Sequence, residues 1–491
     1  MQSPATIENP FGHFFTTWLF CLGLMLVSLN IPVFGAKLTV KVDTNSQTAL
    51  KEQLTAMQSH LYYPASANRF YRNATLKLVW IAPDTVKTHA SEAMMMLDCV
   101  LHYGLNHADY HPGELLYDRL NGLVRSASKA KEGDKARFDI FLTDAMLTFI
   151  NHLHYGKLNP DQPSDKIDTS LISGFRAELI LQKALRSTDF WSVIESVQPK
   201  DKQYAYLQDY MRLVTGQYVG DCYEMPDSTI RLMAINLERL RWTNSSTSSY
   251  LQINIPSYTL TFHQPDTVYN FKAIVGKPFT PTPRLQSKIT HFTTAPEWKV
   301  PQSIFVRELL PKALRDKDYL ENNHFALYDN QGHYQIPAKA KLKEIQRKST
   351  RYYARQSSGC DNAMGAIVFR FSNVYDVYLH DTPQQDLFRR SERAISHGCI
   401  RVEQASKLAA LLLKYDGATN QVVKMQKAVA GYHKQTFRLK TAVPIKITYI
   451  TCEIVEGIIT TYKDIYQLDK QLEKALYLNL RPLLTLYPVK K

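Results

Sequence analysis

The stretch YLHDTPQQDLFRRSERAISHGCIR, residues 378–401, holds the residues that decide both the fold and the chemistry of this chain. Fifteen residues separate His380 from the run Ser396-His397-Gly398-Cys399. A cysteine carries out acyl transfer when a base accepts its proton and backbone N–H groups receive the oxyanion that forms. The stretch supplies candidates for all three parts, so it predicts a cysteine acyl-transfer site.

Each part of this site has a candidate residue. We expect Cys399 to be the nucleophile and His380 to be the base that accepts its proton and later returns one to the leaving amine. Backbone N–H groups around His397, Gly398 and Cys399 are expected to form the oxyanion hole, with Gly398 placed where a side chain would block close approach. The position of His397 inside the turn favours a packing or hydrogen-bonding role over that of a second base.

The flanking segments indicate a strand before the site and a helix after it. The run AIVFRFSNVYDVYLH, residues 366–380, alternates apolar residues with polar or smaller ones and ends at His380, which places the imidazole at a sheet edge. Apolar residues after Cys399 recur on one helical face: Ala405, Leu408, Ala409 and Leu412. We therefore expect Cys399 just before a helix start, where free N–H groups stabilise a thiolate.

His380, its spacer and the run Ser396-His397-Gly398-Cys399-Ile400-Arg401 together resemble the signature of the L,D-transpeptidases of the YkuD type. The segment Tyr378–Pro383 also resembles the large, multidomain Gram-negative branch of that family, whose members are murein L,D-transpeptidases with a scaffold domain. The resemblance covers most of the chain and is strongest from residue 250 to residue 469. It implies an α+β fold, in which a helical N-terminal scaffold domain is followed by a mostly β L,D-transpeptidase catalytic domain with a lid insertion.

The predicted organisation has five parts. Their ranges are 1–36 for a signal peptide or membrane anchor, 37–227 for the helical scaffold domain, 228–249 for a linker helix, 250–470 for the catalytic domain and 471–491 for a C-terminal tail. Within the catalytic domain, the polar and aromatic segment from about Leu310 to Ser358 has low strand character. By resemblance it is the lid, and a mobile surface insertion is the alternative.

The resemblance also assigns an activity. Cys399 would attack the third residue of a peptidoglycan tetrapeptide stem, release the terminal D-alanine, and pass the acyl group to an amine of a neighbouring stem. The backbone carbonyl of Asp381 would orient the imidazole of His380, with the carboxylate of Asp381 as the rival. Arg401 is suited to the carboxylates of the substrate. No metal or organic cofactor is required, and carbapenems are expected to acylate the cysteine.

Three other functions stay open at this point. Water in place of an amine would make the protein an L,D-carboxypeptidase that trims tetrapeptide stems. A non-catalytic wall-binding scaffold could keep the motif without using it. A papain-like peptidase is disfavoured because neither a Cys-Trp signature nor a partner motif bearing Asn is visible.

The composition indicates an anionic partner outside the cytoplasm. The 491 residues carry a formal net charge of +14, with the positive residues dispersed along the chain and without a nucleic-acid-binding signature. We therefore expect peptidoglycan stem peptides, and no nucleic acid, as partners. Neither a GxGxxG nor a Walker-type loop is present, so a nucleotide cofactor is not indicated.

The N-terminal stretch FFTTWLFCLGLMLVSLNIPVFGA, residues 14–36, contains no charged residue. It predicts either a cleaved signal peptide or an anchor in the inner membrane, and hence a periplasmic protein. The lack of Lys and Arg before it, with Lys37 and Lys41 after it, argues against export by the positive-inside rule. We favour export because the expected substrate lies in the cell wall.

Four residues near position 107 raise the question of a metal site: His102, His107, Asp109 and His111. They fall in a predicted turn without a further ligand at metalloenzyme spacing. We interpret them as polar turn residues, with Asp109 as a candidate cap for the following helix.

Overall fold

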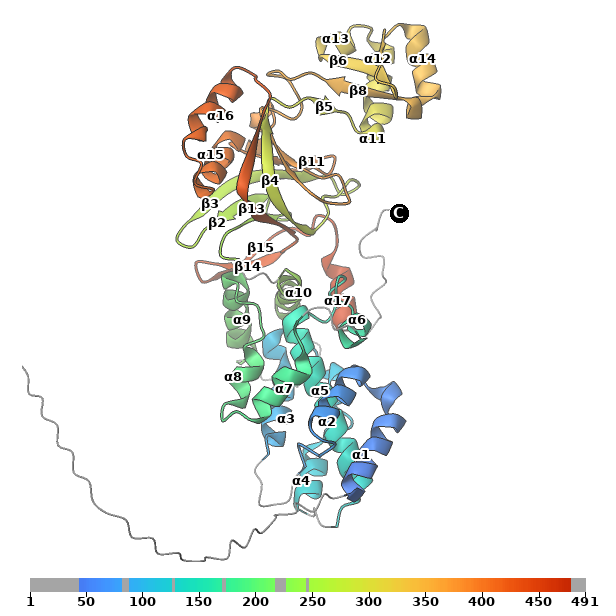
Figure 1. The fold of residues 1–491 in the computed structure, drawn as a ribbon, viewed down its shortest axis with the longest axis vertical. Helices are drawn as coiled ribbons and strands as arrows, with labels where there is room; N and C mark the ends of the chain where they lie inside the picture. The colour runs from blue at the N-terminus through green and yellow to red at the C-terminus, as the bar shows by residue number, and fades with distance from the viewer. Residues whose placement is uncertain are drawn as a thin grey trace, which may run out of the picture. The chain divides into compact units, whose positions relative to one another are not determined.

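The computed structural model describes residues 44–81, 88–125, 129–169, 174–216, 227–243 and 247–477. The predicted signal peptide or anchor at residues 14–36 and most of the predicted C-terminal tail lie outside these ranges. None of the helices in these ranges is both long enough and apolar enough to cross a membrane. A helical region precedes a mostly β domain, which confirms the predicted fold class (Figure 1).

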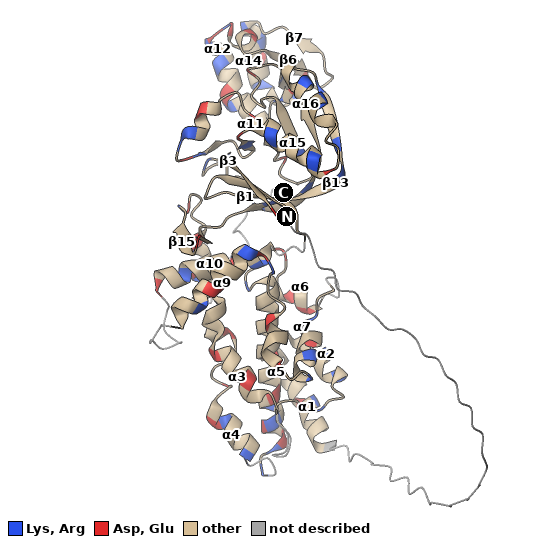
Figure 2. Cartoon of the chain, turned by 90° about the vertical axis from the view of Figure 1, so that its left-hand side faces the viewer, with Lys and Arg blue, Asp and Glu red and all other residues tan. Residues whose placement is uncertain are grey.

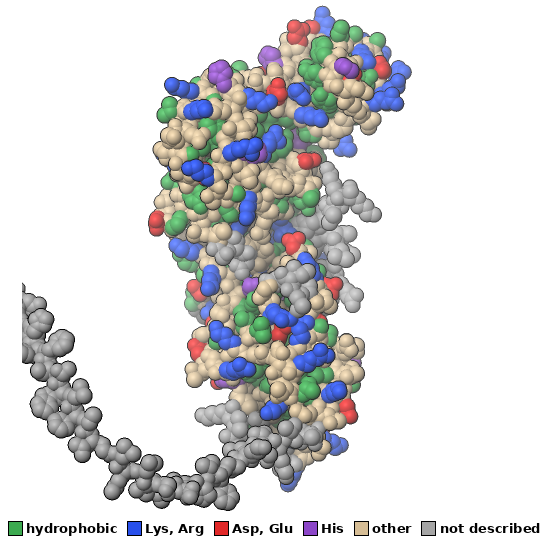
Figure 3. All heavy atoms as spheres, viewed as in Figure 1, with side chains coloured by type: hydrophobic (Ala, Val, Ile, Leu, Met, Phe, Trp, Pro, Cys, Tyr) green, Lys and Arg blue, Asp and Glu red, His purple; other side chains and the backbone are tan. Residues whose placement is uncertain are grey.

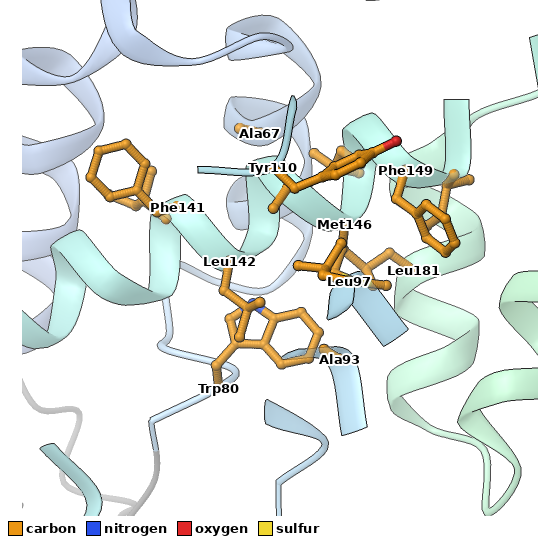
Figure 4. Close-up of a cluster of buried hydrophobic side chains, with 14 of the residues drawn as sticks. Ala67, Trp80, Ala93, Leu97, Tyr110, Phe141, Leu142, Met146, Phe149 and Leu181 are labelled. Carbon is orange, nitrogen blue, oxygen red and sulfur yellow. The ribbon is translucent and has the colours of Figure 1, made fainter. Parts of the chain in front are cut away.

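The helical region is built around α5 (Glu132–Tyr155), which is buried along most of its length. The apolar side chains of this helix are buried, and Leu142, Met146 and Phe149 pack with Trp80 and Leu97 in the core (Figure 4). The neighbouring helices are α1 (Thr44–Ala56), α2 (Pro64–Asn73), α3 (Ala90–Asp98), α4 (Tyr117–Arg125), α6 (Ser164–Thr169), α7 (Ala177–Leu185), α8 (Phe190–Glu195) and α9 (Lys202–Thr215).

Helix α10 (Ser228–Trp242), at the predicted linker helix, contacts both the helical region and the β domain. The Asp227 carboxylate caps its N-terminus by accepting from the N–H groups of Thr229 and Ile230. Near its C-terminus, Arg241 donates to the Tyr103 carbonyl at 2.5 Å, while Arg239 donates to Asp469 at 2.5 Å. These two buried arginines tie α10 to segments far from it in sequence.

The β domain is a mixed nine-stranded sheet in the order β11-β3-β12-β10-β9-β4-β13-β1-β2. Strand β2 also pairs with β3, so eight of the strands close into a ring. The strands are β1 (Tyr250–Asn254), β2 (Thr259–His263), β3 (Val268–Gly276), β4 (Leu285–Thr294), β9 (Ile367–Phe371), β10 (Leu379–His380), β11 (Ala394–Ser396), β12 (Ile400–Val402) and β13 (Gln435–Thr448). The prolines at 278, 281 and 283 separate β3 from β4, because proline has no N–H to donate to a strand ladder.

An aromatic row inside the sheet fixes its register. Phe437 on β13 lies opposite Phe292 on β4, which lies opposite Phe369 on β9, and all three are buried. The rings of Phe292 and Phe437 stack with their centroids 5.2 Å apart. Because side chains alternate across a strand, the residues beside this row point to the outer face of the sheet.

Helices α15 (Ala405–Tyr415) and α16 (Gln421–Ala430) pack against the core side of the sheet through Leu408, Leu412 and Met425. A two-stranded hairpin follows, formed by β14 (Cys452–Val455) and β15 (Ile458–Thr461), with its turn at Glu456 and Gly457. Helix α17 (Asp469–Tyr477) then packs on α10 through Leu472 and Leu476.

An inserted subdomain, residues 298–356, interrupts the sheet between β4 and β9. It contains β5 (Trp298–Lys299), α11 (Gln302–Ile304), a π-helical turn (Phe305–Leu309), α12 (Leu310–Arg315), α13 (Tyr319–Asn322), β6 (Phe325–Asp329), β7 (Tyr334–Gln335), α14 (Lys339–Arg347) and β8 (Tyr352–Gln356). The expectation of low strand character is wrong here, because β5, β8, β6 and β7 form a four-stranded sheet. A separate apolar core that includes Phe305, Leu310 and Ile345 stabilises it.

Charged residues of both signs occur in the helical region and in the β domain (Figure 2). On the face shown in Figure 3, Lys and Arg side chains are spread over the surface and do not merge into one patch. The positive net charge is therefore distributed widely over the described chain.

Candidate active site

Strand register places His380 and Cys399 on the same face of the sheet. Leu379 on β10 lies opposite Ile400 on β12 in a parallel pair, and both side chains point into the core. The Ile400 N–H donates to the Tyr378 carbonyl at 3.1 Å, so the ladder extends to Cys399. By alternation, one outer face carries the side chains of Tyr378, His380, Cys399 and Arg401.

The imidazole of His380 is held by a backbone carbonyl. Its Nδ1 lies 2.6 Å from the Asp381 carbonyl oxygen. A carbonyl only accepts, so Nδ1 carries the proton and Nε2 is left as the basic nitrogen. The Asp381 carboxylate is engaged elsewhere, because it accepts from the Ala366 N–H at 2.8 Å and from Gln385. The geometry thus favours the carbonyl over the carboxylate as the group that orients His380.

Burial, followed by the nearby charge of Arg401, lowers the pKa of His380 to about 3. Burial also raises the pKa of the Cys399 thiol, although hydrogen bonds from Tyr378 and the charges of Arg370 and Arg401 oppose this rise. Both shifts favour a neutral thiol beside a neutral imidazole. The expected stabilised thiolate is therefore wrong for the resting site.

The position of Cys399 explains this difference. Its sequence neighbours Ile400–Val402 form β12, and helix α15 begins only at Ala405. The cysteine therefore lies at the start of a strand and receives no stabilisation from a helix N-terminus. Helical spacing after Cys399 was visible in the sequence, but the intervening strand pairing with β10 and β3 was not.

The sequence prediction missed Tyr378, a residue of the site that affects the pKa of the thiol. Its side chain opposes the rise in the pKa of the Cys399 thiol, while the thiol itself donates to the Asp376 carbonyl at 4.0 Å. The ring of Tyr378 meets that of His380 edge to face, with centroids 5.7 Å apart. The signal was available in the sequence, because residues two apart on a strand share a face.

The hydroxyl of Ser396 stabilises the turn before Cys399. The Ser396 side chain donates to the Cys399 carbonyl at 2.6 Å and accepts from the Gly398 N–H at 3.2 Å. The Gly398 N–H is therefore occupied and is not an oxyanion donor, contrary to the prediction. Within the described ranges, the N–H groups of His397 and Cys399 have no acceptor, and they remain the candidates.

The backbone conformation of Gly398 also favours glycine. Its φ is +114°, a conformation that L side chains rarely adopt. Within the chain itself, a Cβ at this position would meet only the Pro281 and Thr280 carbonyls at 3.8 Å, which is ordinary contact. The expectation that a side chain here would block a reacting group stays a prediction.

The loop between β3 and β4 supports the turn from outside. The Thr282 hydroxyl donates to the Gly398 carbonyl at 2.8 Å and accepts from the Gly276 N–H at 2.8 Å. The Lys277 N–H donates to the Ser396 carbonyl at 3.0 Å. Neither Thr282 nor Lys277 was predicted as part of the site, since only the fold brings this loop to the turn.

Two further predicted residues make contacts that their spacing did not indicate. His397 is exposed, and its Nε2 lies 2.5 Å from Glu308 in the inserted subdomain. This contact agrees with a hydrogen-bonding role. Arg401 donates to Gln384 at 3.0 Å, while its buried Nε has no protein partner in the described chain. That unpaired donor belongs to the residue directly opposite His380 in the β10–β12 pair.

Three of the four residues considered as metal ligands pair with separate residues. Asp109 pairs with Lys157 at 2.7 Å, His107 with Asp98 at 3.3 Å, and His111 with Asp144 at 2.7 Å. Asp109 does not cap the next helix, because α4 begins only at Tyr117. Among the described residues, no group of three or more His, Cys, Asp or Glu is arranged to hold a metal ion.

Comparison with known proteins adds independent findings. Residues 65–211 match the model of a Scaffold domain, and residues 248–437 match that of the YkuD L,D-transpeptidase catalytic domain. A curated protein of Haemophilus influenzae named "Putative L,D-transpeptidase" is 33% identical over 244 residues, which are 50% of this chain and 49% of that protein. The chain thus aligns with about half the length of this relative.

A solved structure of an L,D-transpeptidase from Mycobacterium smegmatis is also similar, at 14% identity. The match covers 42% of this chain and 60% of that chain, with a TM-score of 0.20. A score this low carries no argument about the fold.

Proposed function

Because the chain belongs to the YkuD L,D-transpeptidases and carries their scaffold domain, we propose that it cross-links peptidoglycan stems through an acyl-enzyme on Cys399. The single observation that supports this most directly is the parallel pairing of β10 with β12, which puts Cys399 and His380 on one face of the sheet. A nucleophile and an oriented base in this relation are what acyl transfer requires.

The proposed reaction has two stages. His380 Nε2 takes the thiol proton as Sγ attacks the carbonyl of the third stem residue, and the oxyanion accepts from the N–H groups of His397 and Cys399. The bond to the terminal D-alanine then breaks, and its amine takes the proton from His380. An amine of a second stem attacks the thioester, forms the new amide and restores the thiol.

The neutral resting pair suits this order of events. The Nε2 lone pair of a neutral imidazole is free at physiological pH, but its lowered pKa makes it a weak base that does not ionise the thiol in advance, and a neutral thiol avoids a buried charge before substrate arrives. Attack and proton transfer therefore occur together in the first stage.

We place this reaction in the periplasm, with residues 14–36 as the export signal or anchor. The support is the uncharged composition of that stretch. Fractionation of cells that produce the full chain tests this, and recovery in the cytoplasm alone would contradict it.

Mass spectrometry of muropeptides tests the reaction. Purified protein incubated with tetrapeptide stems is expected to release D-alanine and to form dimers linked through third residues. Cys399→Ala should give no product with an unchanged melting temperature, while Cys360→Ala, which removes another free and exposed cysteine, should leave the yield unchanged. Tripeptides without dimers would indicate a carboxypeptidase, and an unchanged yield from Cys399→Ala would refute the proposal.

A further inference from the structure

Two strongly exposed apolar side chains lie on loops beside the catalytic turn. Among the large apolar residues that the structure describes, Val374 and Phe279 are the most exposed, at 84% and 78%. Single exposed apolar residues are common on protein surfaces. Their placement on either side of one nucleophile is what gives these two residues meaning, and we call them the two apolar walls.

Strand order puts the two apolar walls on opposite sides of Cys399. Strand β12, which begins at the residue after Cys399, lies between β3 and β10 in the sheet. It runs antiparallel to β3 and parallel to β10, so the end of β3 and the start of β10 lie at the same edge as Cys399. The loop that carries Phe279 follows β3, and the loop that carries Val374 precedes β10.

The loop of Phe279 is bound to the catalytic turn. The Thr280 N–H donates to the Lys277 carbonyl at 2.9 Å, so residues 277–280 form a tight turn. The Lys277 N–H and the Thr280 hydroxyl both donate to the Ser396 carbonyl, at 3.0 Å and 3.2 Å. Phe279 is thus held next to the residues that precede Cys399, while its side chain stays exposed.

The loop of Val374 is fixed as well, and it contacts the thiol. The Asn373 side chain closes this loop with four hydrogen bonds to backbone groups of its own segment, at 2.7–3.1 Å. The Asp376 carbonyl accepts from the Cys399 thiol at 4.0 Å. Val374 therefore lies two residues from a group that contacts the nucleophile.

The spacing of the two apolar walls suits the two residues that flank a scissile peptide bond. Neighbouring strands lie about 4.8 Å apart, so β3 and β10 each lie about one strand spacing from β12. An extended peptide advances about 3.3–3.6 Å per residue. A stem that lies across the strands, with its attacked carbonyl at Cys399, therefore places one residue beside each loop.

His380 determines which residue meets which wall. In the proposed reaction the leaving amine takes its proton from His380, which lies on β10. The terminal D-alanine is therefore on the side of Val374, and the third residue is on the side of Phe279. Because cross-links between third residues use a side-chain amine, the third residue carries that amine on an aliphatic chain. A methyl group on one side and methylene groups on the other both gain free energy by packing on apolar walls.

We propose that Phe279 and Val374 are specificity-determining residues of the acyl-donor site. Phe279 packs on the methylene chain of the third stem residue, and Val374 packs on the methyl group of the D-alanine that leaves. The proposal rests on the function proposed above, since it takes that stem as the donor. It requires that the two substitutions affect different parts of the substrate.

Acylation kinetics of the full-length protein with matched stems test the assignment of Phe279. With lysine as the third residue, Phe279→Ala is expected to lower kcat/KM about 5- to 30-fold, and Phe279→Leu should restore most of it because the apolar contact returns. With diaminopropionate, which keeps the amine on a shorter methylene chain, Phe279→Ala should change kcat/KM less than about twofold.

The leaving residue tests Val374 in the same assay. Val374→Ala should lower kcat/KM about 2- to 5-fold for a stem that ends in D-alanine, and should have no effect on a stem that ends in glycine. Ile458→Ala, which removes another exposed apolar side chain from β15, is the control and should change nothing. Losses that are independent of the varied substrate residue, or that Ile458→Ala reproduces, would overturn the two apolar walls.

Alkylation of Cys399 separates this proposal from the proposed reaction. N-benzyl iodoacetamide, which extends an apolar ring from the sulfur, should alkylate Cys399 about 3- to 10-fold more slowly in Phe279→Ala, whereas iodoacetamide should react with both proteins equally. Mass spectrometry of the Cys399 peptide gives both rates. Equal slowing of both reagents, or of neither, would overturn the wall at Phe279. If stems give no product but only the benzyl reagent is slowed, the proposed reaction fails and the wall stands.

Discussion

Asp139 in the helical region and His380 in the β domain are both buried titratable residues, but they differ in how fully they are paired. Asp139 accepts from the Tyr71 hydroxyl and from the N–H groups of Val79, Trp80 and Ile81. His380 uses one nitrogen on the Asp381 carbonyl and keeps the other basic. A buried polar group whose hydrogen-bonding capacity is fully used, which we call saturated, stabilises a fold. An unsaturated group, which keeps one nitrogen or oxygen free beside a nucleophile, is available for chemistry.

The largest effect should come from removing the unsaturated group. His380→Gln is expected to lower kcat/KM about 10²–10⁴-fold, since the general base is lost, with little change in melting temperature. His333→Gln, on an exposed histidine of the inserted subdomain, is the control. A loss of activity below tenfold would mean that His380 is not the base.

The pH dependence sharpens this test. With its pKa lowered to about 3, His380 stays neutral and basic down to about pH 4. The unfolded chain takes up this proton near the ordinary value of 6.5, so the contribution of His380 to stability falls as pH drops from 6.5 towards 3. An acid limb of kcat/KM near 6.5 that disappears in His380→Gln would contradict the burial effect.

Removing the saturated group should affect stability and spare catalysis. Asp139→Ala leaves the N–H groups of the Val79–Ile81 segment unpaired, and we expect the free energy of unfolding to fall by about 2–4 kcal/mol. Asp134→Ala, at an exposed position on the same helix, should cost below about 1 kcal/mol. Denaturant titration measures both, and kcat of the folded Asp139→Ala protein should be unchanged.

Asp139 also makes a distinct pH prediction. Burial raises its pKa from 3.8 to about 6, so the folded state binds more protons than the unfolded state between these values. Its contribution to stability is therefore greatest below pH 4 and declines as pH rises to 6. Asp139→Asn should remove this slope, and an unaltered pH dependence of unfolding would show that the carboxylate is not protonated in this range.

The sequence predicted what depends on local pattern. The strand that ends at His380 and the buried helical face of Ala405, Leu408, Ala409 and Leu412 follow from periodicity. The side chains of His380 and Cys399 lie on the same face of the sheet, which agrees with the grouping of both residues in one sequence motif. The strand after Cys399 was missed because three residues that pair with distant strands carry little local signal.

Residues brought in by long-range pairing could not be found in the sequence. Thr282 reaches the turn from another loop, and His291, Arg370 and Arg438, which are far apart in the sequence, lie opposite one another on three neighbouring strands. Only strand order and register bring them together. The occupied N–H of Gly398 likewise depends on the rotamer of Ser396, which no spacing reveals.

Tyr378 tests whether a missed residue tunes the nucleophile. Tyr378→Phe removes the hydroxyl that lowers the pKa of the Cys399 thiol, so this pKa should rise. We expect alkylation of Cys399 by iodoacetamide to slow about 3- to 10-fold at neutral pH, with the pH profile moved to higher values. A rate that is unchanged across pH would leave Tyr378 with a packing role only.

The smallest effect should come from the contact between the inserted subdomain and the catalytic turn. Glu308→Gln keeps a hydrogen-bond acceptor for His397 but removes the charge, and both side chains are partly exposed. Exposed ion pairs contribute below about 1 kcal/mol, so we expect a change in kcat/KM of less than about fivefold, smaller at high salt. Glu308→Ala removes the acceptor as well and should cost more than Glu308→Gln. If both variants lose activity to the same extent as His380→Gln, His397 has a part in the chemistry. His397 would then count, like His380, among the groups that are available for chemistry.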